Sequence, residues 1–259
     1  MLTSRRRQRR LKLTLDLEHE RSLNRSKDQL IANLSHELRT PLTSIYGASA
    51  TLDEAGFDDP ELARELNGMV VEQSRDLTRM VDDLLISAQA QADRLTFKIA
   101  PTSIAPEVDT VLGEFRRAGT AIAVDVVDAE VMADPLRLRQ ILRNLVSNAI
   151  RHGGGRTAVV GRSAADCYRI SVVDDGPGVP ADVEKDLFQP FVNAGDRALV
   201  TGSIGLGLSI TRVLAEGMEG AVSYQRRGGN AWFTLDLPVA VEEAGTAEPV
   251  ETAAGAGVG

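Results

Sequence analysis

Leucine and isoleucine recur along the first part of the chain at spacings of three, four and seven residues. The first set lies at Leu30, Leu34, Leu38, Leu42, Ile45 and Leu52. A second, heptad-like set lies at Leu62, Leu66, Met69, Gln73, Leu77, Met80, Leu84 and Ala88. Such spacing places these side chains on one face of a helix, so it predicts two long amphipathic helices. The second helix should begin at Asp59-Pro60, a capping carboxylate followed by proline, and end near Gln91.

Two helices of this length joined by a short break at residues 55–60 predict an antiparallel hairpin. One hairpin buries its apolar stripes poorly. Two copies that pair into a four-helix bundle would bury both stripes, so the pattern predicts a homodimer.

The pattern changes near Leu95 to short apolar runs separated by turn residues and further helices. Strands are expected at residues 96–99, 121–126, 131–133, 157–162, 168–173, 221–225 and 232–237, and helices at 105–116, 135–151 and 205–217. This mixture predicts an α/β sandwich. Residues 241–259 lack large side chains and are expected to be disordered.

The expected fold class is therefore multidomain, α plus α/β. Its parts are a basic N-terminal arm with a helical lead-in (1–24), a helical domain (25–94), an α/β domain (95–240) and a disordered tail (241–259).

Composition narrows the function classes. The 259 residues carry 29 basic and 37 acidic side chains, a net charge of -8, which argues against general nucleic-acid binding. The single cysteine, Cys167, cannot form an internal disulfide, so a reducing cytoplasm is expected. The chain contains no run of eighteen or more apolar residues, so the sequence predicts no membrane-spanning helix. A basic cluster forms a solvated arm or, alternatively, flanks a membrane helix further upstream; it comprises Arg5, Arg6, Arg7, Arg9 and Arg10.

The first candidate for chemistry is His36, which is followed by Glu37 and lies one helical turn before Thr40. His36 is off the apolar stripe and is expected to face outward. A single histidine in a helix is usually a solvated or structural residue. With a carboxylate beside it and a hydroxyl on the same helix face, His36 is a candidate phosphoacceptor.

The second candidate is a nucleotide site. Asn144 and Asn148 share a helix face, and their amide oxygens suit Mg²⁺; Arg151 and His152 follow one turn later. An apolar strand delivers Asp174 to a turn that contains Gly176 and Gly178. Before an amphipathic helix, a further stretch offers backbone N–H groups to phosphate and contains Gly202, Gly205, Leu206 and Gly207. Residues 188–202 are long enough to act as a lid or to be an ordinary surface loop.

Residues 33–42 resemble the H box of sensor histidine kinases. The stretches around Asn148, Asp174, residues 187–191 and Gly205 resemble, in the same order, the N, G1, F and G2 boxes of the family's catalytic domain. The resemblance covers about residues 25–237. It implies a HisKA-type dimerisation and phosphoacceptor domain followed by an α/β sandwich of the GHKL (Bergerat) ATPase type.

This resemblance implies the roles of the site residues. His36 would attack the γ-phosphate of ATP, with Glu37 orienting the imidazole and assisting proton removal. Asn148 would ligate Mg²⁺, Asn144 would support the phosphates, and Asp174 would bind adenine. The phosphoryl group would pass to an aspartate of a response regulator, and Thr40 would orient water for removing it again. Two residues depart from the common pattern: Arg151 replaces lysine and His152 replaces tyrosine.

Two other functions remain open at this point. One is a regulator phosphatase or dimeric scaffold without autokinase activity, although the retained His36, Glu37, Asn148 and Asp174 argue against it. The other is an ATP-driven clamp like the topoisomerase and chaperone ATPases that share the nucleotide fold. The helical segment around His36, ahead of the α/β domain, favours the kinase.

Overall fold

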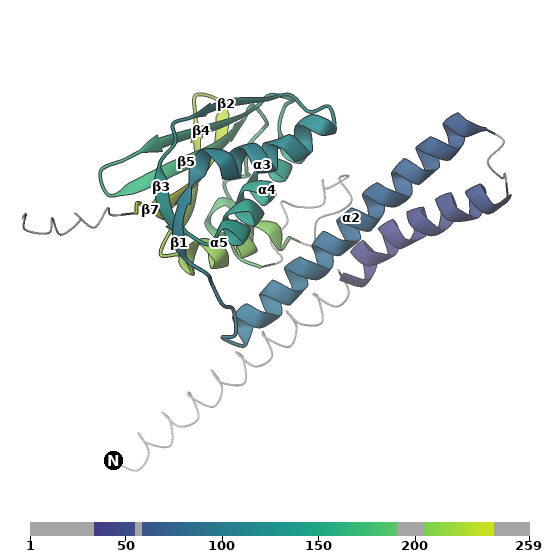
Figure 1. Ribbon diagram of the computed structural model, residues 1–259, viewed down its shortest axis with the longest axis horizontal. Coiled ribbons are helices and arrows are strands. Elements are labelled where there is room, and N and C mark those ends of the chain that lie inside the picture. The colour runs from purple at the N-terminus through teal and green to yellow at the C-terminus, as the bar shows by residue number, and fades with distance from the viewer. Residues whose placement is uncertain (1–33, 55–58, 191–204, 241–259) are drawn as a thin grey trace, which may run out of the picture.

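The protein consists of a long helical hairpin and an α/β domain that packs against the second hairpin helix (Figure 1). The computed structural model describes residues 34–54, 59–190 and 205–240. The expected N-terminal arm, the tail, Gly202 and most of the expected lid lie outside these residues.

The hairpin forms as its pattern predicts. Its first helix covers residues 34–54, and its second, α2, runs from Pro60 to Gln91. The carboxylate of Asp59 accepts hydrogen bonds from the backbone N–H groups of Glu61 at 3.0 Å and Leu62 at 3.1 Å, so the predicted cap is confirmed. Within α2, whose residues are all described, only Ile86 is buried. Most of the hairpin surface is therefore left uncovered in a single chain.

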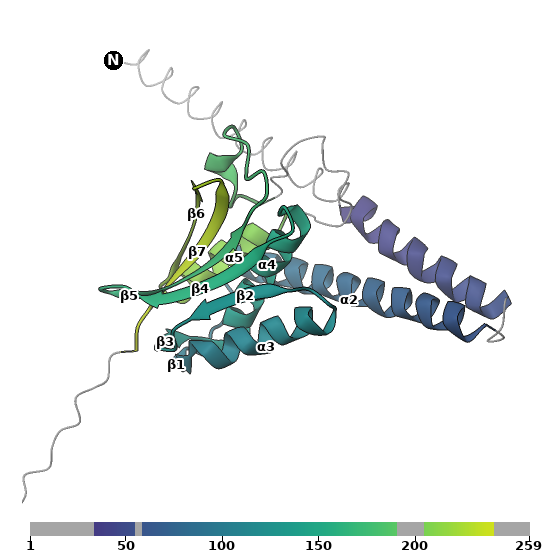
Figure 2. The same cartoon turned by 90° about the horizontal axis from the view of Figure 1, so that it is seen from above.

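The α/β domain is a two-layer sandwich. Its main sheet has the order β2-β4-β5-β7-β6, in which only β2 and β4 run parallel. The three helices of the domain pack on one face of this sheet (Figure 2). The sheet strands are β2 (Ile122–Val126), β4 (Thr157–Ser163), β5 (Cys167–Asp174), β6 (Ala221–Arg227) and β7 (Asn230–Pro238), and the helices are α3 (Ile104–Arg117), α4 (Pro135–His152) and α5 (Gly207–Glu216). A second, two-stranded sheet pairs β1 (Ala100–Ser103) with β3 (Glu130–Ala133), and a 3₁₀ turn, η1, covers Glu184–Asp186.

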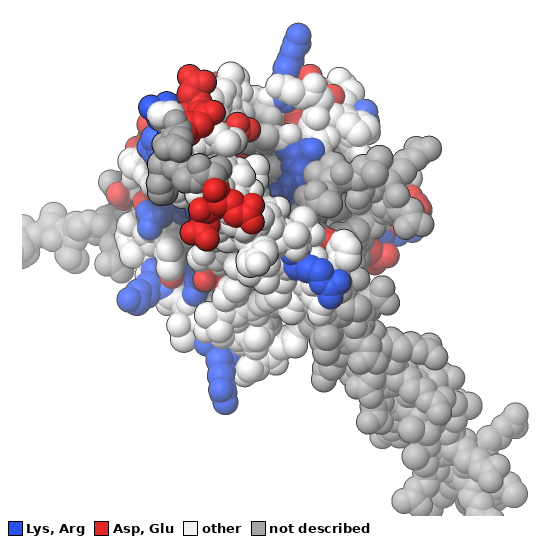
Figure 3. All heavy atoms as spheres, turned by 90° about the vertical axis from the view of Figure 1, so that its right-hand side faces the viewer, with Lys and Arg blue, Asp and Glu red and all other residues white. Residues whose placement is uncertain are grey.

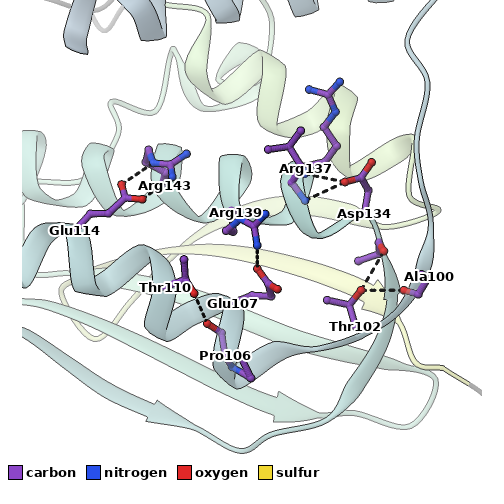
Figure 4. A network of polar contacts seen from close by, with 12 residues as sticks. Ala100, Thr102, Pro106, Glu107, Thr110, Glu114, Asp134, Arg137, Arg139 and Arg143 are labelled. Carbon is purple, nitrogen blue, oxygen red and sulfur yellow. Dashed lines mark hydrogen bonds and ion pairs between the residues drawn. The ribbon is translucent and has the colours of Figure 1, made fainter. Parts of the chain in front are cut away.

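Two ion pairs join α3 to α4 (Figure 4). Glu107 bonds Arg139 at 2.6 Å, and Glu114 bonds Arg143 at 2.8 Å. The carboxylate of Asp134 caps the start of α4 by accepting hydrogen bonds from the next two backbone N–H groups along the helix. Both pairs are partly exposed to solvent, so each contributes little to stability.

The sequence-based prediction of the first strand is wrong. Residues 96–99 form no strand, and β1 begins only at Ala100. The backbone N–H of Lys98 instead donates to the carboxylate of Asp134 at 2.8 Å, and the ring of Phe97 lies against Gly217 at the end of α5. These residues thus anchor the segment between the hairpin and the domain through contacts that are distant in sequence.

Charges of both signs are scattered over the face shown in Figure 3, with no broad basic surface. None of the described helices is both long and apolar enough to cross a bilayer.

Candidate phosphoacceptor and nucleotide site

His36 lies on the outward face of the first helix, as the sequence predicts. Its side chain is 72% exposed, whereas that of Glu37 is 21% exposed. The imidazole Nδ1 and the Glu37 Oε1 are 3.8 Å apart, which is longer than a direct hydrogen bond. The imidazole is therefore accessible to a second molecule or to a moving domain, and the adjacent carboxylate is near enough to contact it after a small rotation.

Thr40 is exposed one turn after His36. Its hydroxyl lies 3.4 Å from the backbone carbonyl of His36, a long contact at the limit of a hydrogen bond. The hydroxyl thus lies beside the backbone of His36, one turn further along the same helix.

Asn144 and Asn148 lie one turn apart on α4, and both are half-buried. The Asn144 amide donates to the carbonyl of Gly207 at 3.2 Å, which ties α4 to the first residue of α5. Asn144 therefore contacts the N-terminal end of α5. That end supplies backbone N–H groups and a positive dipole, which suit a phosphate.

The end of α4 carries two further candidates, Arg151 and His152. Burial lowers the pKa of Arg151, while the negative charge of Glu37 raises it. The carboxylate beside the candidate phosphoacceptor therefore lies within electrostatic reach of the helix that carries the asparagine pair. Loss of solvent and the positive charge of Arg151 lower the pKa of His152, and the charge of Asp174 opposes this shift.

Asp174 is 5% exposed at the end of β5. Burial raises the pKa of its carboxyl, although that carboxyl accepts a hydrogen bond from the Gly176 N–H at 3.0 Å. A Cβ at position 176 would lie 2.6 Å from the carbonyl oxygen of His152. Only glycine lets the turn after Asp174 approach the end of α4 this closely.

The segment before α5 supplies the remaining described candidates. Gly205 has a positive φ of 70°, Leu206 is 2% exposed, and Gly207 begins the helix. Asn144 thus meets the start of α5, and the turn after Asp174 meets the end of α4. The described residues contain no group of three or more His, Cys, Asp or Glu side chains that could hold a metal ion.

Two residues at this site were missed by sequence reasoning. Tyr224 and Arg226 on β6 hydrogen-bond the backbone of the turn after Asp174. They lie about fifty positions further along the chain, and nothing in their local pattern marks them, because the sheet alone brings them to the turn.

Comparison with known proteins identifies two families in the chain. Residues 26–93 match the His Kinase A (phospho-acceptor) domain, and residues 133–241 match the histidine kinase-, DNA gyrase B- and HSP90-like ATPases. The second family alone includes both kinases and ATP-driven clamps, whereas the first is specific to the phospho-acceptor function.

Among curated proteins, the chain is 31% identical over 219 residues to the probable sensor histidine kinase TcrY of Mycobacterium tuberculosis, covering 82% of this chain and 46% of TcrY. It is 28% identical to the sensor histidine kinase YvrG of Bacillus subtilis, covering 83% of this chain and 39% of YvrG. The chain thus spans less than half the length of these two relatives.

Solved structures of histidine kinases are also similar to this chain. The Acinetobacter baumannii histidine kinase AdeS matches with a TM-score of 0.59 at 25% identity, over 79% of this chain and 98% of the AdeS chain. Full-length ShkA in complex with AMPPNP matches with a TM-score of 0.56 at 30% identity, over 82% of this chain and 46% of ShkA.

Proposed function

Because the chain belongs to the sensor histidine kinases, with a HisKA and a HATPase_c domain, we propose that it is an ATP-dependent autokinase that phosphorylates His36. The phosphoryl group then passes to an aspartate of a response regulator. The observation that carries the proposal is the exposed His36 with Glu37 beside it. On the same chain, α4 meets the start of α5 through Asn144 and meets the turn after Asp174 at its own end.

In this reaction a neutral ring nitrogen of His36 attacks the γ-phosphorus of ATP, and the bond from that phosphorus to the β,γ-bridging oxygen breaks. ADP leaves with that oxygen, and the proton of the imidazole is lost. Glu37 is placed to orient the ring and to accept the proton. The neutral form of the imidazole is the nucleophile, because a protonated ring has no free nitrogen lone pair.

The α/β domain positions the nucleotide. Asp174 accepts a hydrogen bond from the amino group of adenine, and the backbone N–H groups at 205–207 meet the phosphates. Asn144, Arg151 and His152 support the phosphate side. Asn148 would offer an amide oxygen to Mg²⁺, and a bound Mg²⁺ would supply positive charge beside the phosphates.

Pairing of two hairpins into a four-helix bundle accompanies this function. The hairpin exposes large apolar side chains in the single chain, among them Leu42 at 52% and Leu85 at 54%. A second copy of the hairpin would cover them.

The test is labelling by [γ-³²P]ATP with Mg²⁺ in the wild type and in His36→Gln. Acid-labile, alkali-stable label that disappears in the variant is expected. His19→Gln is the matched control, because His19 is also followed by a glutamate, and it should label normally. If the wild type binds ADP but stays unlabelled, the autokinase proposal is wrong.

The position of Thr40 favours a second activity at the same site. We infer that its hydroxyl, exposed one turn from His36, orients water for hydrolysis of the phosphorylated regulator. Thr40→Ala should then keep autophosphorylation and lose regulator dephosphorylation, whereas Thr40→Ser should keep both. Equal dephosphorylation by the wild type and Thr40→Ala would contradict this role.

A further inference from the structure

The turn that follows Asp174 is held at both ends by residues outside it. At its start, the Arg156 N–H donates to the Asp175 carboxylate at 2.9 Å, and the Gly176 N–H donates to Asp174. At its end, the Val179 N–H donates to the hydroxyl of Tyr224 at 2.9 Å, and a guanidinium N–H of Arg226 donates to the carbonyl of Pro177. The contacts at the end of the turn come from one strand, β6.

Gly178 makes these two contacts possible. Its φ is +74°, a conformation that L side chains rarely adopt, and a Cβ there would overlap the guanidinium of Arg226 and lie 2.8 Å from the Tyr224 oxygen. The turn therefore folds directly onto the two β6 side chains. Its shape depends on them, because no side chain at position 178 separates them from the backbone.

The two side chains differ in their surroundings, because Tyr224 is packed on the sheet whereas Arg226 is exposed. Tyr224 is 9% exposed, and its ring packs on Phe233, its partner on β7, with centroids 5.0 Å apart. Arg226 pairs with Ala231 in the same ladder. Arg226 is also one of the positive charges that lower the pKa of Asp174, so its guanidinium lies within electrostatic reach of that carboxyl. The ladder from β5 through β7 to β6 thus places Tyr224 and Arg226 on the strand that contacts the end of the turn.

We propose that Tyr224 and Arg226 are positioning residues for the nucleotide base: they hold residues 177–179 so that a purine can reach Asp174 in only one orientation. The proposal rests on the proposed role of Asp174 in binding adenine. A carboxylate accepts a hydrogen bond from the adenine amino group and repels the carbonyl oxygen that guanine carries at that position. This discrimination requires a base that cannot slide or tilt, and a loosened turn would relax it.

The test compares Tyr224→Phe and Arg226→Met with the wild type, all as the full chain. Tyr224→Phe keeps the ring on Phe233 and removes only the acceptor oxygen. Arg226→Met keeps much of the side-chain length and removes the donors. Losing one hydrogen bond to the turn should raise the KM for ATP and the Kd for ADP about 3- to 10-fold, with kcat nearly unchanged. The preference for ATP over GTP should fall by a similar factor.

Arg227→Met is the matched control. Arg227 neighbours Arg226 but contacts Gln225 on its own strand, so the same substitution there should leave KM, Kd and base preference at wild-type values. Arg226→Lys should restore part of the lost affinity, because an ammonium can still donate to the Pro177 carbonyl. Circular dichroism melting should show that all variants are folded.

The proposal is overturned if Tyr224→Phe and Arg226→Met bind ADP and GDP like the wild type, or if they lower kcat alone. Calorimetric binding separates it from the autokinase proposal, since ADP and GDP affinities are measurable without phosphorylation. A wild type that binds ADP but never labels overturns only the autokinase. A wild type that binds no nucleotide overturns both.

Discussion

Asp174 is a buried carboxyl that the proposed function requires in its ionised form. Burial raises its pKa above the ordinary value. Between that ordinary value and the raised pKa the folded state binds more protons than the unfolded state, so this group makes stability fall as pH rises through that window. At neutral pH the charged, buried carboxylate therefore destabilises the nucleotide-free domain.

Asp174→Asn should consequently separate stability from function. An amide can still accept the hydrogen bond from Gly176, but it carries no charge to bury, so the melting temperature of the nucleotide-free variant at pH 7 should equal or exceed that of the wild type. The Kd for ADP should rise about 10- to 100-fold, the usual cost of losing a hydrogen bond to a charged group. Thermal melting measures the melting temperature, and calorimetry measures the Kd for ADP. Asp166→Asn, in the exposed β4–β5 turn, is the control. Wild-type ADP affinity in Asp174→Asn would contradict the role of Asp174.

At the level of elements, α2 joins the hairpin to the α/β domain. Its apolar side chains Met80, Leu84 and Ile86 pack against the core of that domain, and Asp83 on the same helix accepts a long hydrogen bond of 3.5 Å from Gln140 on α4. The charges that act on Asp83 are those of Asp82 and Arg79 on its own helix. Loss of solvent dominates and raises the pKa of Asp83 to about 6.

This contact should depend on pH. The folded pKa of Asp83 exceeds its unfolded value, so its carboxyl favours the packed structure below about pH 4 and weakens it progressively as pH rises to about 6. Above that window the penalty is constant. Asp83→Asn should therefore stabilise the protein at pH 7. It should also remove the fall in stability that the loss of this proton causes between about pH 4 and about pH 6. Thermal melting at a series of pH values measures both effects. Asp82→Asn, at the exposed neighbouring position, is the control. Parallel pH profiles of wild type and Asp83→Asn would show that Asp83 is not buried in solution.

For the molecule as a whole, the hairpin is the part that leaves large apolar side chains exposed in a single chain. The α/β domain has a continuous apolar core, whereas the hairpin exposes Val81 at 53% and Leu85 at 54%, one turn apart on α2. Large apolar side chains at this spacing on an elongated hairpin are expected to pair with a second copy.

The double variant Val81→Glu/Leu85→Glu should therefore convert a dimer to a monomer. Both side chains are exposed in the single chain, so the fold of each chain should survive, which circular dichroism verifies. Analytical ultracentrifugation at low micromolar concentration measures the change. Ala164→Glu/Ala165→Glu adds the same charge in the exposed β4–β5 turn and should stay dimeric. A wild type that sediments as a monomer would contradict the expected pairing.

The amino-acid sequence by itself determined the features that depend on neighbouring residues. The start of α2 follows from Asp59 and Pro60, because a capping bond spans two or three residues. The outward position of His36 follows from helical periodicity, and the strands β4 to β7 follow from alternating apolar runs bounded by turns.

The tertiary structure alone decided what depends on contacts between distant segments. Residues 96–99 carry a strand-like pattern, yet the Lys98 N–H bonds Asp134, thirty-six positions away, and no strand forms. The bonds of Tyr224 and Arg226 to the turn after Asp174 and the burial of Asp83 against α4 are of the same kind. Periodicity reports which face of an element is apolar, but it does not report which other element covers that face, because packing is settled only when the whole core assembles.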